Sequence, residues 1–274
     1  MAPIPPAMVA FLRLVVLLFV PLLLRAAPPA PLAAALQQLR DQKSYSWETI
    51  NSDPGPVAQR IETRRGTVTT VQQNLAPNVQ GRIDRQGDML IRREWADGLV
   101  LETVITAAGA SATKTPEGWM SDREILTAQS EERLRNRTAT PRAVWLRRAD
   151  RPDVLRPDQE LAPLLKFTAP FTATGNGYRV AFRSRAGDTL TEDPDDGEPA
   201  TTVEITLNLR GGSIRDYELK LEGVRRVQRS RIQVPVSEQR IVVLKYLPIS
   251  KLDLPPEARE KLAAPRGGPP ARTP

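Results

Sequence analysis

The sequence predicts an α+β fold in which a strongly curved antiparallel β-sheet packs its apolar face on two or three helices. A further helix is expected near the amino terminus. Three observations lead to this prediction. Many segments alternate apolar and polar residues at the strand period of two. Tight turns rich in glycine, asparagine and aspartate join these segments. Helix-start signals occupy the middle third of the 274 residues, between two strand-rich regions.

The first 27 residues have the pattern of an export signal. Arg13 precedes an apolar run over 14–24, and Arg25, alanines and prolines follow it. Because a membrane-spanning helix needs about 20 apolar residues, we expect the signal to be removed and the protein to be periplasmic or extracellular. The alternative is a protein held at the inner membrane by an uncleaved amino-terminal segment. Residues 28–262 are predicted to form one domain, and 263–274 a disordered tail.

The first half of this domain is predicted to be a helix followed by strands. Leucines at 32, 36 and 39 follow helical spacing. The segment SYSWETI then alternates, with Tyr45, Trp47 and Thr49 on one face, and a further strand is expected near 57–64. Turns at 86–88, 96–98 and 107–109 predict an antiparallel meander over 79–115. Its apolar face carries these residues: Met89, Ile91, Trp95, Leu99, Leu101, Thr103 and Ile105.

Helices are predicted in the middle of the chain. The segment Thr115-Pro116-Glu117-Gly118 is typical of a type I turn, and Ser121 precedes Glu124 by the three residues of a capping box. Pro157 suits the first turn of a helix over 157–167. A weaker helix is expected over 141–148.

The last third is predicted to return to sheet. Asn176-Gly177 indicates a hairpin between strands at 167–174 and 178–184, and Gly211-Gly212 indicates another between alternating segments at 203–209 and 217–221. Two more strands are expected, over 224–236 and 238–247.

Several chemistries are disfavoured by composition. The chain has no cysteine, which removes disulfides, thiolate chemistry and a lipid-bearing cysteine. It has no histidine, which removes the commonest general base and metal ligand. Glu102, Glu117 and Glu124 could meet in space, but spacing alone does not establish a glycosidase pair. We therefore expect no enzymatic activity, no cofactor and no metal.

Charged segments suggest partners of different kinds. The net charge is +7, and removal of Arg13 and Arg25 with the signal leaves +5. The acidic loop 187–199 lacks the spacing of a calcium-binding loop and is expected to be an exposed connection of unassigned role. The strand VRRVQRSRIQV has four arginines without aromatic neighbours. This pattern disfavours nucleic acid and leaves either a solvated strand or contact with an anionic envelope surface.

The order of elements also carries a resemblance. An amino-terminal helix, the strand SYSWETI, a meander, KTPEGWMSDRE with helices and a second meander follow one another. This order resembles the periplasmic lipoprotein-carrier (LolA/LolB-like) half-barrel proteins. It is also similar to a group of exported bacterial proteins, without an assigned activity, that share segments like SYSW, KTPEGW, RPDQELAPLLK and LPPEAREKL. The resemblance to lipoprotein carriers implies a half-barrel sheet that shields acyl chains.

We therefore expect an exported, non-enzymatic binder or carrier of a hydrophobic or amphiphilic, lipid-like component. The alternative is a structural or interaction protein of the cell envelope with a filled core and a basic outer surface. The aromatic residues line a cavity in the first case and fill the core in the second, and Trp119 is either a packing residue or part of the ligand-lining wall. The oligomeric state is open. The candidate ligand-lining residues are Tyr45, Trp47, Trp95, Leu101, Ile105, Trp119, Leu207 and Leu219.

Overall fold

A computed structural model describes most of the chain between residues 27 and 263. The described ranges are 27–52, 57–63, 66–72, 76–135, 140–150, 156–167, 169–184, 201–226 and 233–263. For 57–72 and 224–236 only the backbone is described. Apart from Ala27 and Ala263, the predicted signal and tail lie outside these residues, as does the acidic loop 187–199. The side chains of the arginine-rich strand also lie outside them.

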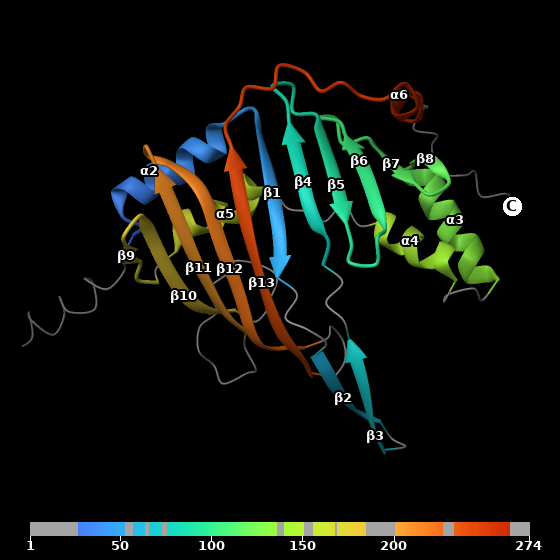
Figure 1. Cartoon of the computed structure of the whole chain (residues 1–274), viewed down its shortest axis with the longest axis horizontal. Coiled ribbons are helices and arrows are strands. Elements are labelled where there is room, and N and C mark those ends of the chain that lie inside the picture. Colours follow the sequence, from blue (N-terminus) through green and yellow to red (C-terminus); the bar gives the residue numbers. More distant parts are fainter. Residues whose placement is uncertain are drawn as a thin grey trace, which may run out of the picture. The chain divides into compact units, whose positions relative to one another are not determined.

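The described strands confirm an α+β fold with a large antiparallel sheet. The sheet is open and has eleven strands in the order β8-β7-β6-β5-β4-β1-β13-β12-β11-β10-β9, and β2 and β3 form a separate pair (Figure 1). The strands are β1 (Tyr45–Ser52), β2 (Val57–Thr63), β3 (Gly66–Gln72), β4 (Asn78–Ile83), β5 (Met89–Glu94), β6 (Val100–Ile105), β7 (Ser111–Thr115), β8 (Gly118–Ser121), β9 (Thr172–Thr174), β10 (Gly177–Ser184), β11 (Thr201–Arg210), β12 (Ser213–Arg226) and β13 (Gln233–Lys245). The helices are α2 (Ala30–Asp41), α3 (Asp122–Leu134), α4 (Pro141–Ala149), α5 (Pro157–Leu161), the 3₁₀ helix η2 (Ala162–Lys166) and α6 (Pro256–Ala263).

The chain divides into two compact units, which we describe separately. Unit 1 contains α2 except its last residue and the whole of Asp158–Ser237, and therefore β9 to β12. Unit 2 contains β1, β4 to β8, α3, α4, α6 and the part of β13 that follows Ser237.

The meander of unit 2 has the predicted turns. Backbone hydrogen bonds close the loops at Asp84–Asp88, Trp95–Leu99 and Thr106–Ala110. Each loop has a glycine with positive φ at its fourth position, where a side chain would be strained. The strand β1 then pairs with β4 on one side and β13 on the other, so residues 45–52 join segments that are distant in sequence.

The segment around Trp119 differs from the prediction in one respect. The predicted capping box at Ser121 and Glu124 is confirmed and begins α3. The sequence did not predict β8, a four-residue strand that pairs Trp119 with Lys114 and Met120 with Thr113. Four residues are too few for alternation to be recognised, and the pairing with β7 is what makes this segment a strand.

Unit 1 confirms two hairpins and corrects several boundaries. Thr174 pairs with Gly177, so the first hairpin turns through Gly175 and Asn176, and its first strand is only Thr172–Thr174 instead of 167–174. The helix predicted over 157–167 is also wrong in extent. It divides into α5 and η2, and Pro163 explains the division because it cannot donate the α-helical hydrogen bond. The strand expected over 224–236 is divided between the ends of β12 and β13.

Candidate functional site

Five of the candidate ligand-lining residues lie on one face of the unit 2 sheet, which we call the inner face. Tyr45 and Trp47 are 1% and 3% exposed, and their rings are 5.7 Å apart. Trp95 and Leu101 belong to a buried cluster that the helices complete. Its members are Trp95, Leu101, Ile125, Ala128, Trp145, Leu146 and Ala149. The helices α3 and α4 therefore pack on the inner face beneath β5 and β6.

Ile105 is half-buried on this inner face, where it pairs with Met89 of β5. The other three candidates are placed differently. Trp119 pairs with Lys114, which itself pairs with Glu102, so Trp119 lies on the outer face of the sheet, opposite Met120. Leu207 and Leu219 are buried in unit 1, where they lie on the same face of β11 and β12 as Tyr217.

Trp47 lies over a glycine of the neighbouring strand. Gly81 is its direct partner on β4, and a Cβ atom at Gly81 would be 2.1 Å from Cζ2 of the indole. The indole Nε1 is buried and donates no hydrogen bond within the described part of the chain. The missing side chain of Gly81 is therefore what lets the Trp47 ring lie flat on the inner face.

Arg93 lies on the apolar inner face, and the sequence analysis missed it. It is 2% exposed and donates hydrogen bonds to Thr103 Oγ1 at 3.0 Å and to the carbonyl of Arg148 at 2.9 Å. Thr103 in turn shares a 3.0 Å hydrogen bond with Thr113. The alternation that placed Ile91 and Trp95 on this face also placed Arg93 there, and a charged residue at such a position was the available signal.

Two guanidinium groups hold the Trp95 ring. The Cζ atoms of Arg93 and Arg148 lie 5.6 and 5.1 Å from its centroid, within cation-π range. Arg148 also pairs with Asp97 at 2.7 Å. The hydrogen bond from Arg148 holds the pKa of Asp97 below its ordinary value, against a smaller opposing effect of burial. Trp95 is 7% exposed, so little more than one edge of the ring is available to a ligand.

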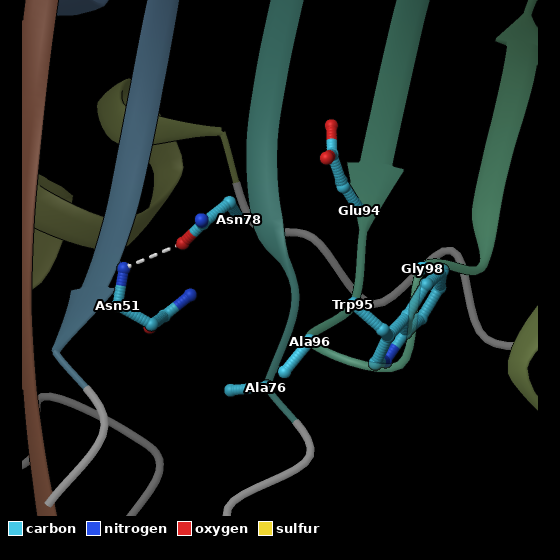
Figure 2. A pocket seen from close by; sticks show the side chains of 7 residues that line it. All are labelled: Asn51, Ala76, Asn78, Glu94, Trp95, Ala96 and Gly98. Carbon is cyan, nitrogen blue, oxygen red and sulfur yellow. Dashed lines mark hydrogen bonds between the residues drawn. The ribbon is translucent and has the colours of Figure 1, made fainter.

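A pocket of about 290 Å³ lies where β1, β4 and β5 end. Its lining residues are Asn51, Ala76, Asn78, Glu94, Trp95, Ala96 and Gly98 (Figure 2). The backbone N–H of Asn51 donates to Asn78 Oδ1 at 2.9 Å, and Asn51 Nδ2 donates to the carbonyl of Pro77. The sequence analysis named only Trp95 of this set. Asparagine is common near strand ends and in turns, so nothing in the sequence distinguishes Asn51 and Asn78 as residues that meet in a pocket.

The three glutamates considered for catalysis each have a cationic partner. Glu102 lies 3.8 Å from Arg92, Glu117 lies 2.7 Å from Arg142, and Glu124 lies 2.6 Å from Lys261. The hydrogen bond from Arg142 lowers the pKa of Glu117. Burial raises the pKa of Glu124, but hydrogen bonds from Lys261 and Ser121 outweigh it and the net pKa is lowered. A general acid needs the opposite shift.

The Glu117 pair predicts a small acid sensitivity. Because the folded pKa of Glu117 lies below its ordinary 4.5, its contribution to stability is present above pH 4.5 and is lost as the pH falls through the folded value. Glu117 is 44% exposed, so solvent screening limits the effect to about 0.5 kcal/mol. We expect Glu117→Gln to flatten the pH dependence of unfolding by urea below pH 4.5.

A matched control for this variant is Glu131→Gln, since Glu131 is an exposed carboxylate on α3 without an ion pair among the described residues. The control variant should leave the pH dependence of unfolding below pH 4.5 as in the parent protein. If Glu117→Gln also leaves that pH dependence unchanged, Arg142 does not favour the ionised form of Glu117.

The wider comparisons add no family to this description. Neither the known protein families nor the curated proteins contain a match to this chain. No helix in the described ranges is both long and apolar enough to cross a lipid bilayer. The same residues bring together no cluster of acidic side chains suited to a metal ion.

Proposed function

We propose that this chain is an exported, non-enzymatic protein of the cell envelope that acts by surface contact with an envelope component. The observation that carries the proposal is the packing of the unit 2 inner face. Trp95 and Leu101, which were expected to line a lipid cavity, are covered by Ile125 of α3 and by Trp145 and Leu146 of α4. A face filled by the protein's own side chains suits a structural or interaction role.

Some exposed arginines of each unit already have acidic partners. Arg92 lies 3.3 Å from Glu94 and 3.8 Å from Glu102, and in unit 1 Arg179 pairs with Glu204. These two arginines are neutralised locally. Contact with an anionic surface would use other cations, such as the exposed Arg82 and Lys114 of the outer face and the arginines of 224–236, whose side chains lie outside the described residues.

The carrier hypothesis is the second candidate, and Trp47 is the observation that favours it. A buried indole N–H without an acceptor costs free energy, and an acceptor on a bound amphiphile would remove that cost. The half-barrel shape implied by the resemblance to lipoprotein carriers belongs to this hypothesis.

Two measurements on protein purified after export separate the candidates. Organic extraction followed by mass spectrometry should yield no stoichiometric lipid if the inner face is filled. Sedimentation with isolated envelope fragments should remove the protein from solution, and added salt should weaken this binding if the basic strand contributes. Stoichiometric lipid would favour the carrier, and failure to sediment in low salt would contradict the surface-contact proposal.

A further inference from the structure

The pocket at the ends of β1, β4 and β5 has the chemistry of a binding site for a small neutral ligand. Its volume of about 290 Å³ is close to the lower end of small-molecule sites, which begin at roughly 300 Å³. The lining consists of three polar side chains, the indole of Trp95 and three small residues, Ala76, Ala96 and Gly98, whose small size leaves space for a ligand. A long acyl chain would need a larger and more apolar wall.

The orientations of both asparagine side chains are fixed by backbone partners. Asn78 Oδ1 accepts from the backbone of Asn51, so the Asn78 Nδ2 group is left to donate elsewhere. Asn51 Nδ2 donates to the carbonyl of Pro77, so Asn51 Oδ1 is left to accept. Within the described part of the chain these two groups have no other partner. In Figure 2 the side chains of Asn51 and Asn78 lie next to each other, and Ala76 and Ala96 lie below them. The pocket thus presents one amide donor group and one amide acceptor.

The charges around the pocket are already paired. Glu94 lies 3.3 Å from Arg92, and its side chain points along β5 away from the two asparagines (Figure 2). Asp97, in the adjoining turn, lies 2.7 Å from Arg148. A charged ligand would have to compete with these pairs, whereas a neutral ligand would not. The surroundings therefore favour a neutral ligand with several hydrogen-bonding groups.

The position of the pocket in the sheet argues against an extended peptide. Peptides commonly bind by adding a strand to a free sheet edge, where main-chain groups lack partners. The strands β1, β4 and β5 are interior strands, each with a neighbour on both sides. Recognition must therefore use side chains. Hydroxyl groups both donate and accept, so they can satisfy Asn78 Nδ2 and Asn51 Oδ1 together.

From these observations we infer that the pocket binds a neutral saccharide unit. The inference rests on the proposed contact with an envelope component and specifies the class of that component as a glycan. Asn78 Nδ2 donates to a sugar hydroxyl, and Asn51 Oδ1 accepts from one. The edge of Trp95 forms the apolar side of the site, and its ring is held by Arg93 and Arg148.

The four tryptophans allow the site to be followed directly. In the ¹⁵N-labelled, purified protein they give four indole N–H signals, and a Trp95→Phe variant identifies the signal of Trp95. Chitotriose and maltotriose are the probes, and a capped trialanine peptide tests the competing ligand class. We expect a saturable shift of the Trp95 signal with at least one of the two sugars and none with the peptide.

A matched pair of variants tests the role of the amide. Asn78→Asp keeps the oxygen that accepts from Asn51 and removes the Nδ2 donor, so it should weaken sugar binding about three- to tenfold. Gln80→Glu makes the same amide-to-carboxylate change two residues away on the same exposed face of β4, outside the pocket, and should leave binding unchanged. Ala96→Tyr, at an exposed lining position, should block the pocket and abolish the shift. It also serves as the test if Asn78→Asp fails to fold.

The outcomes separate this inference from the proposed function. Absence of a saturable Trp95 shift with both sugars overturns the inference, as does a shift with the peptide alone or equal weakening by Asn78→Asp and Gln80→Glu. Sugar binding that persists in Ala96→Tyr overturns it as well. Sedimentation with envelope fragments can still occur in each of these cases, so the surface-contact proposal would stand on its own measurement.

Discussion

Gly81→Ala should lower the free energy of unfolding by about 3 kcal/mol, the upper part of the range for overpacked sites. The new methyl group would lie 2.1 Å from Cζ2 and 2.2 Å from Cε2 of Trp47. The indole ring cannot simply move aside, because Trp47 is only 3% exposed. The backbone of Trp47 is also fixed, since it pairs with Gly81 on one side and Leu244 on the other. Urea denaturation followed by tryptophan fluorescence measures the loss.

A control and a double-mutant cycle make this prediction specific. A Cβ atom at Gly175 meets nothing within 4 Å, so Gly175→Ala should be close to neutral. Trp47→Leu should be less harmful in the Gly81→Ala background than in the parent protein, with a coupling of at least about 1 kcal/mol. Additive effects of the two substitutions would show that the methyl group and the ring do not meet.

Asp84→Asn should cost about 2 to 3 kcal/mol, although the side chains have nearly the same size. Asp84 is fully buried, and its Oδ1 accepts from the backbone N–H groups of Gln86 and Asp88 at 2.8 and 3.1 Å. Its Oδ2 accepts from the N–H of Leu252 at 2.9 Å. An asparagine has only one side-chain oxygen. In either orientation its NH₂ group would therefore replace an acceptor and lie against a backbone N–H donor. The loss should appear in urea denaturation.

The aspartate next to Leu252 provides the control. Asp253 is fully exposed, and its one ion pair among the described residues is with Arg259 at 3.1 Å, so Asp253→Asn should leave the urea midpoint close to that of the parent protein. If Asp84→Asn is as mild as Asp253→Asn, the buried carboxylate is not what ties residues 249–252 to the turn between β4 and β5.

Much of the local structure was available from the sequence. The alternation of Val203, Ile205 and Leu207 predicted a strand with one buried face, and all three are 0% exposed. Ser121 and Glu124 predicted the start of α3, because both partners of a capping box lie within four residues of each other. The paired glycines at 211 and 212 predicted their turn, since both adopt positive φ.

Little of the candidate site was available in the same way. Trp95 was named for its hydrophobic size, but Asn51 and Asn78 were not, because they converge only when β1 pairs with β4. Trp119 was expected to face the interior, as either a packing residue or a ligand wall. The structure places Trp119 on β8, where its pairing with Lys114 of β7 puts it on the outer face. A shift of one residue in that pairing would reverse the face.

The sequence by itself determined the α+β class, the turns of the meander and the start of α3, because these depend on residues within a few positions of one another. Tertiary structure alone decided the placement of β1 between β4 and β13, the fit of Trp47 over Gly81 and the burial of Arg93. These features join residues that are distant in the chain. Their formation depends on the packing energy of a specific strand register balanced against the entropy of closing long loops, and a local pattern contains neither quantity.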